Sequence, residues 1–332
     1  MMGHQAVTMI KKGSLRLLGL GVPGLLVLAG FSGDALAAAF PGLGFGGTGC
    51  GGTGMGAVLC NVVESSSELP YLLSGICYLL GLVLAVWAIL KLKDHVLNPN
   101  QTPLSDSMKR FIAGGAFFAL PIVIDAVYNT VAEGIDGSAE TGFNTTTVTG
   151  QGLDAMITAM MADIWGPVHL LIGGFAYLAG LILVAIGISR LLKSSQEGPR
   201  GPGGMGTIAT FLVAGALLSA NAMMGAFNTS LFGTPDITTY ATLSFSGGVT
   251  GAQLDHIHNV ISAVLAFLMV IGWISFIRGW FIVREVAEGS QQASLMAGMT
   301  HIFGGALAVN LGPVLTAVQE TFGITGYGIT FT

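Results

Sequence analysis

The residues able to do chemistry are few and lie far apart in the sequence. Asp125 is the one acidic residue within an apolar run, where a carboxylate can carry a proton through a membrane. The corresponding positions further along the chain hold Asn221 and Asn310, and an amide cannot exchange protons in this role. The three side chains therefore predict polar contacts between neighbouring helices, and the two amides are expected to contribute about 1 kcal/mol each.

Asp255-His256-Ile257-His258 is the only cluster of histidines. Side chains two positions apart on an α-helix point about 200° away from each other. The two rings therefore cannot share a metal ion, and no further ligand is near them in the sequence. There is also no Gly-x-Ser-x-Gly, His-Glu-x-x-His or Walker A sequence. The sequence predicts no enzymatic activity, no cofactor and no metal.

The composition places the chain in a membrane. Of its 332 residues, 52% are hydrophobic and only 9% are charged, whereas soluble domains carry about 25% charged residues. The net charge of −5 offers no basic face to nucleic acid. These values exclude a soluble enzyme, a disordered segment and a nucleic-acid binder. We expect a polytopic protein in contact with membrane lipid.

The first 37 residues have the three parts of a secretory signal peptide. The basic segment 11–16 precedes an apolar run over 17–30 and the small-residue site Ala35-Leu36-Ala37. Cleavage is expected after Ala37 or after Ala39. An uncleaved signal-anchor helix is the alternative.

A glycine-rich exported arm is predicted over 38–70, with nine glycines between positions 41 and 56. Such a segment loses much entropy on ordering and has few side chains to pack, so we expect it to be flexible. Cys50 and Cys60 flank its end. In an exported segment these two residues predict a disulfide, with two unpaired thiols as the alternative.

Six apolar runs are each about long enough to cross a hydrocarbon core as a helix. They are Tyr71–Leu90, Phe111–Val131, Val168–Ser189, Thr207–Phe227, Val260–Ile277 and Met296–Val318. Outside the signal, every basic residue lies in one of three connections: Lys91, Lys93, Lys109 and Arg110; Arg190, Lys193 and Arg200; Arg278 and Arg284. By the positive-inside rule these connections are cytoplasmic. We therefore predict an all-α bacterial inner-membrane protein with both mature termini in the periplasm.

The six spans pair into three hairpins that read as repeats. Tyr78 and Tyr177, Gly81 and Gly180, and Lys91 and Arg190 are all 99 residues apart. The predicted organisation is a signal peptide (1–37), the arm (38–70), hairpin one (71–133), an acidic periplasmic loop (134–165), hairpin two (166–228), a periplasmic loop (229–257), hairpin three (258–320) and a periplasmic tail (321–332).

Each return helix contains Gly-Gly-Ala or Ala-Gly-Ala, and Gly304-Gly-Ala306 matches Gly114-Gly-Ala116. Small residues let helix backbones approach closely in lipid, where apolar surface alone gives no drive for association. The residues predicted to pack helices are Gly81, Gly114, Gly115, Gly180, Gly215, Gly304 and Gly305.

About sixty residues of the first hairpin carry a resemblance to a known family. They include Gly81-Leu-Val-Leu84, Lys91-Leu-Lys-Asp-His95, Asn98-Pro-Asn-Gln-Thr-Pro-Leu104, Gly114-Gly-Ala116 and Leu120-Pro121. In these residues the chain resembles the IcmC/DotE and IcmD/DotP inner-membrane proteins of Dot/Icm (type IVB) secretion systems and their conjugative relatives.

The resemblance implies a structural, non-enzymatic component of an apparatus that moves protein or DNA across the envelope. Its implied partners are other envelope subunits of the system and further copies of the chain. A small multi-span transporter or channel subunit is the alternative function.

Overall fold

The computed structural model describes residues 54–66, 69–132, 152–197, 204–233, 237, 241–243, 251–324 and 329–331. The signal segment 1–37, Cys50, Arg200 and the loop residues 134–151 lie outside them. The described elements, in chain order, are α4 (Met55–Ser66), α5 (Leu69–Leu97), α6 (Leu104–Phe118), α7 (Leu120–Ala132), α8 (Leu153–Glu197), α9 (Gly204–Leu218), α10 (Ala220–Phe232), β1 (Ala241–Leu243), α11 (Gly251–Ala287), α12 (Leu295–Val309), α13 (Leu311–Thr321) and β2 (Ile329–Phe331).

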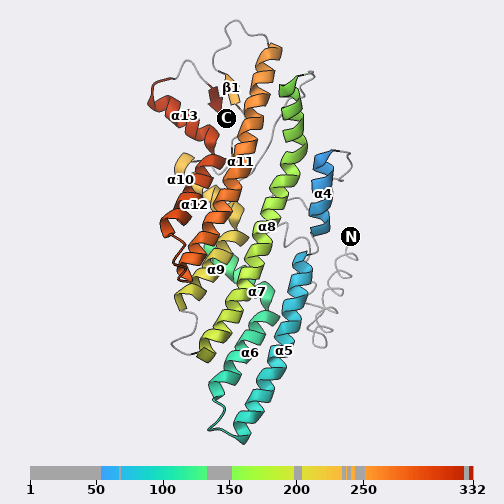
Figure 1. The fold of residues 1–332 in the computed structure, drawn as a ribbon, viewed down its shortest axis with the longest axis vertical. Coiled ribbons are helices and arrows are strands. Elements are labelled where there is room, and N and C mark those ends of the chain that lie inside the picture. The colour runs from blue at the N-terminus through green and yellow to red at the C-terminus, as the bar shows by residue number, and fades with distance from the viewer. Residues whose placement is uncertain are drawn as a thin grey trace, which may run out of the picture.

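One arrangement occurs three times along the chain. A long helix (α5, α8 or α11) is followed by a 15-residue helix (α6, α9 or α12), which packs back against it. A single non-helical residue then separates this helix from a shorter one (α7, α10 or α13). The three long helices run in the same direction in Figure 1. The residues at the breaks are Ala119, Ser219 and Asn310.

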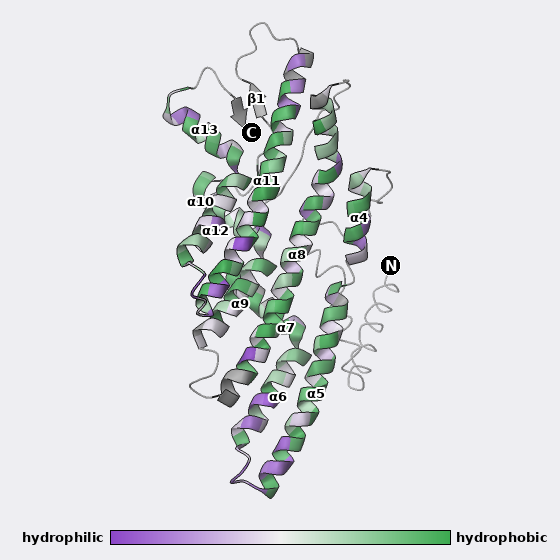
Figure 2. Ribbon diagram, viewed as in Figure 1, coloured by the Kyte–Doolittle hydropathy of each residue, from purple (hydrophilic) through white to green (hydrophobic). Residues whose placement is uncertain are grey.

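The all-α prediction is confirmed for the described residues, apart from the short β1–β2 pair. Three helices there are long and apolar enough to cross a membrane: Leu72–Leu97, Ala155–Leu192 and His256–Ala287. Five candidates result if α9 with α10, and α12 with α13, are each counted as one span. The apolar helices indicate a membrane-embedded protein (Figure 2).

The prediction of about six membrane-spanning helices is not confirmed by the described residues. Helix α10 bends away from α9 by 81°, and α13 bends away from α12 by 82°. The predicted spans Thr207–Phe227 and Met296–Val318 are therefore broken spans or re-entrant segments. The predicted span Phe111–Val131 falls on α6 and α7, which are not among the candidate spans.

Local chemistry explains the break at Asn310. Pro313 has no N–H to donate to the carbonyl of Val309, where α12 ends, and its ring clashes with that carbonyl. The Asn310 Nδ2 donates to the Ala306 carbonyl at 2.9 Å, a side-chain bond that competes with regular helix. At the other bend, the Ser219 hydroxyl bonds the carbonyl four residues earlier at 2.7 Å.

The long helices extend beyond their predicted spans. Helix α8 begins at Leu153, inside the predicted loop 134–165, and its 45 residues are about 68 Å long. Helix α11 begins at Gly251, inside the predicted loop 229–257, and its 37 residues are about 56 Å long. Because a hydrocarbon core is about 30 Å thick, both helices must continue well outside it. The predicted loops are therefore partly helical.

A small antiparallel sheet lies near the N-terminal end of α11. Strand β1 pairs with β2 in the register Ala241 with Phe331, Thr242 with Thr330, and Leu243 with Ile329. The pairing connects the predicted loop 229–257 to the predicted tail 321–332.

The core lies where α8, α9, α11 and α12 meet. Val184, Leu217, Met269 and Phe276 are fully buried there. An aromatic series crosses it, in which His169 stacks on Trp165 and meets Trp273 edge-on at 5.5 Å between ring centroids. Helix α5, by contrast, exposes most of its apolar side chains, including Leu79, Val83 and Val86. This surface suits contact with lipid or with another helix.

Candidate functional site

Each long helix meets its returning partner at a position where the two backbones almost touch. A Cβ atom built on the long-helix glycine would lie 2.8 to 3.1 Å from a carbonyl oxygen of the partner. Real Cβ atoms rarely come closer than 3.4 Å to such an atom, so these positions accept only glycine without a shift of the helices. The crossings are Gly81 with Gly114, Gly180 with Ala214, and Gly272 with Gly305.

The predicted packing glycines divide into three groups. Gly81, Gly114, Gly180 and Gly305 lie at the crossings. Gly215 instead faces α7, and a Cβ added to it would lie 2.8 Å from the Val127 carbonyl oxygen. This close approach joins the second hairpin to the first.

Two of the predicted packing positions contact no other helix within the described residues. Nothing lies within 4 Å of a Cβ built on Gly115 or Gly304, since both point away from the partner helix. The Gly304–Gly114 match is one residue out of register, because Gly305 holds the position equivalent to Gly114. Sequence reasoning also missed Gly272, which precedes Gly305 by the same 33 residues that separate Gly81 from Gly114.

A buried amide pair connects the two bent helices. Asn310 lies at the break between α12 and α13, and its Nδ2 donates to Oδ1 of Asn228 on α10 at 2.5 Å. Both residues are 1% exposed. The Oδ1 of Asn310 is buried and accepts no hydrogen bond within the described residues. A polar contact of Asn310 with a neighbouring helix was expected, and its partner is a residue that sequence reasoning did not single out.

The other predicted intramembrane polar residues take different positions. Asn221 is 5% exposed and lies on the same face of α10 as Asn228, seven residues earlier. Asp125 belongs to α7, but its side chain lies outside the described residues. A signal for Asn228 exists in the sequence, because Phe227-Asn-Thr229 matches Tyr128-Asn-Thr130 one repeat earlier.

We expect the Asn228–Asn310 pair to couple the stabilities of the two bent helices. In a double-mutant cycle with Asn228→Ala and Asn310→Ala, the coupling free energy should be about 1 kcal/mol, measured by equilibrium unfolding in detergent micelles. The matched control cycle pairs Asn310→Ala with Thr229→Ala, whose hydroxyl bonds only its own helix at 2.9 Å. That cycle should give a coupling near zero. Equal coupling in the two cycles would contradict the assignment.

The residues predicted to mark the cytoplasmic side lie near the C-terminal ends of the long helices and the start of α6. Arg190 and Arg284 both pair with Glu288, at 2.9 and 2.5 Å, so one carboxylate connects the ends of α8 and α11. Arg110 pairs with Asp106 at 3.1 Å and lies over the Trp87 ring. The remaining described members are Lys91, which pairs with Asp94 at 3.9 Å, together with Lys93, Lys109 and Arg278. The Lys193 side chain and Arg200 lie outside the described residues.

The end of the glycine-rich arm is not wholly flexible, because α4 packs on the extended part of α8. The Gly56 N–H donates to Oδ2 of Asp163 at 2.7 Å. This carboxylate satisfies one of the unpaired donors at the helix N-terminus and interacts favourably with the helix dipole. Cys60, in the middle of α4, is disulfide-bonded, and Cys77 is a free, buried thiol.

No family model, curated protein or solved structure matches this chain. The likeness to Dot/Icm components therefore stays a prediction based on residues of the first hairpin. Within the described residues, no group of three His, Cys, Asp or Glu side chains is placed to hold a metal ion. What this part of the chain offers is a set of tight helix crossings, an amide contact at the bends and a docked helix on α8.

Proposed function

We propose that the protein is a structural inner-membrane component of a type IV secretion or conjugation apparatus that moves protein or DNA across the envelope. The observation that carries this proposal is the extension of α8 beyond the hydrocarbon core, with α4 docked on its side. A helix that continues rigidly out of the bilayer presents a fixed surface to other subunits, which a flexible loop does not.

The three helical hairpins support the same proposal. We infer that they are repeats in one orientation, with the basic ends of α5, α8 and α11 in the cytoplasm and the extended ends of α8 and α11 in the periplasm. Backbone contact at the three crossings limits movement within each hairpin, and the ion pairs of Arg190 and Arg284 with Glu288 connect the second hairpin to the third. Rigidity of this kind suits a scaffold. The resemblance of the first hairpin to Dot/Icm proteins supplies the specific system.

Removal of the protein should abolish export of the apparatus's substrate, because an envelope channel lacking an integral scaffold cannot assemble. The measurement is substrate transfer by a deletion strain, with the same strain carrying the intact gene as control. After cross-linking in intact cells, the purified protein should carry other envelope subunits. Normal export by the deletion strain, together with purification of the protein as a stable monomer without other subunits, would contradict the proposal.

The alternative function is a small transporter or channel subunit, and the bent helices favour it. Transporters often place broken helices at a polar site near the middle of the bilayer. Asn310 lies at the break between α12 and α13, and its buried Oδ1 accepts no hydrogen bond within the described residues. Substitutions at Asp125, Asn221 and Asn310 distinguish the two functions. A transporter should lose flux across proteoliposomes in this series, whereas a scaffold should show no flux before or after substitution.

A further inference from the structure

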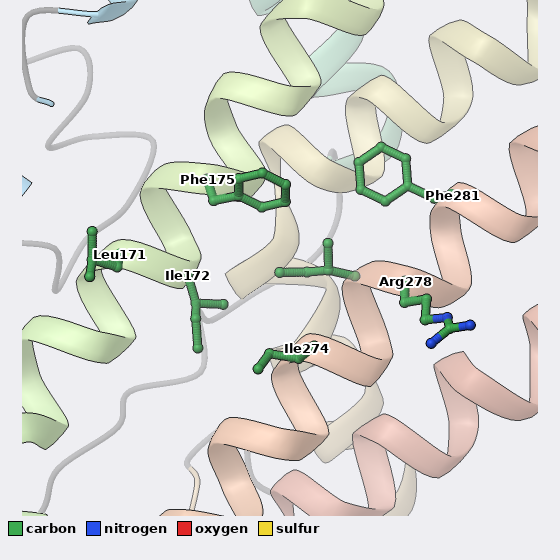
Figure 3. A pocket seen from close by; sticks show the side chains of 7 residues that line it. Leu171, Ile172, Phe175, Ile274, Arg278 and Phe281 are labelled. Carbon is green, nitrogen blue, oxygen red and sulfur yellow. The ribbon is translucent and has the colours of Figure 1, made fainter.

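An apolar pocket opens between α8 and α11 on the outside of the bundle (Figure 3). Its volume is about 360 Å³, within the range of ligand pockets. Phe175 on α8 and Phe281 on α11 lie on opposite sides of it, and Ile172 and Ile274 line the space between the helices. Phe175 is 59% exposed and Ile274 54% exposed, so a molecule in the surrounding lipid can enter from the side.

Arg278 is the single charged residue lining this pocket. It lies on the same face of α11 as Ile274 and Phe281, four residues before it and three residues after it. Its side chain extends along the edge of the pocket on the side away from Leu171 (Figure 3).

The surroundings of Arg278 differ from those of the other arginines near this end of the bundle. Arg190 and Arg284 share Glu288. Arg278 lies six residues before Arg284, about 9 Å deeper along α11, and within the described residues it has neither an ion pair nor a hydrogen bond. An arginine inside a candidate span normally pairs with another group or reaches the interface. The other residues that line the pocket are all apolar.

We propose that the pocket binds an anionic phospholipid, with part of an acyl chain between Phe175 and Phe281 and the headgroup phosphate on Arg278. Two features select this class of ligand. The apolar lining, open to the side, accepts hydrocarbon, and the guanidinium at its edge matches the charge and planar hydrogen-bonding geometry of a phosphate. A zwitterionic lipid also offers a phosphate, but its own ammonium offsets the attraction. Basic residues at pockets between membrane helices recognise anionic headgroups in this way.

The test measures lipid retained by the purified full-length protein in mixed micelles that contain either phosphatidylglycerol or phosphatidylcholine, using native mass spectrometry. The wild type should retain phosphatidylglycerol in preference. Arg278→Gln should reduce that retention about fivefold, the effect of losing one basic residue near a membrane surface. Arg278→Lys should retain most of it. Ile274→Trp, which fills the pocket and leaves the arginine in place, should reduce retention as well.

Lys93→Gln is the matched control, because it removes the same charge from an exposed position on α5 that does not line this pocket. It should leave retention unchanged, and all variants should elute as monodisperse protein. Equal losses in Arg278→Gln and Lys93→Gln, or no preference between the two lipids, would overturn the proposal. Displacement of phosphatidylglycerol by millimolar inorganic phosphate would also overturn it, since the site would then bind phosphate without its acyl chains.

Discussion

Gly305→Val should lower the free energy of unfolding by about 3 kcal/mol, near the upper end of the usual cost of overpacking. A Cβ at Gly305 would lie 2.6 Å from the Phe276 nitrogen and 2.7 Å from the Gly272 carbonyl oxygen. Both atoms belong to the backbone of α11, so no side chain can rotate to make room. Helices α11 and α12 must therefore separate, and the contact of the third hairpin must be lost. Equilibrium unfolding in detergent micelles measures the effect.

Gly304→Val provides a matched control in the same helix, because it adds the same side chain with the same helix propensity. Nothing lies within 4 Å of a Cβ at Gly304, and the position faces away from α11. Its effect should stay within about 0.5 kcal/mol, as for a surface substitution. Equal destabilisation by the two substitutions would show that helix propensity, and not the crossing, determines the cost.

This pair also shows how far the sequence predicts the packing. The adjacent glycines Gly304 and Gly305 indicate that this helix approaches another one closely. The motif alone does not say which of the two faces the partner helix. The answer depends on where α12 begins and on the angle at which it crosses α11. The long helices are easier to predict, because a sustained apolar run with no alternation has few other stable structures in lipid.

The bends were missed because a hydropathy pattern does not change at a break. Pro313 and Pro121 each lie two or three residues after a break, and they were the available local signals. Helix α10, which follows the break at Ser219, contains no proline, and the side-chain bond of Ser219 marks that bend. The Asn228–Asn310 contact spans 82 residues and depends on both bends. This pairing cannot be predicted from one sequence in which the positions of the bends are unknown. The sequence does identify Asn310 as a polar residue that needs a partner.

The packing of α4 on α8 could not be predicted from the sequence for a different reason. Glycines dominate positions 41–56 and predict a flexible arm, yet Met55–Ser66 is a helix whose N-terminal glycine, Gly56, is needed for contact with α8. Gly56 is buried, and a Cβ there would collide with the Asp163 carbonyl oxygen. The partner is 107 residues away in the sequence. Glycine here serves close approach between two backbones, in addition to the flexibility that composition suggests.

Gly56→Val should therefore release α4 from α8. The added side chain collides with the backbone of α8, and a free helix of 12 residues is only marginally stable in water. Amide hydrogen exchange over Met55–Ser66, followed by mass spectrometry, should accelerate by about 30-fold, which corresponds to a loss of about 2 kcal/mol. Gly166→Val, three residues beyond Asp163 with open space at its Cβ, should leave the exchange unchanged.

Two substitutions at Asp163 separate the steric part of this contact from the electrostatic part. Asp163→Asn keeps an oxygen to accept the Gly56 N–H and loses only the charge, so exchange should accelerate about threefold, the effect of removing an anion from a helix N-terminus. Asp163→Ala removes the acceptor as well, and a lost helix cap costs about 1 kcal/mol, so exchange should accelerate about fivefold. Unchanged protection in Gly56→Val would contradict the assignment, because the close approach of the Gly56 and Asp163 backbones would then not hold α4 on α8.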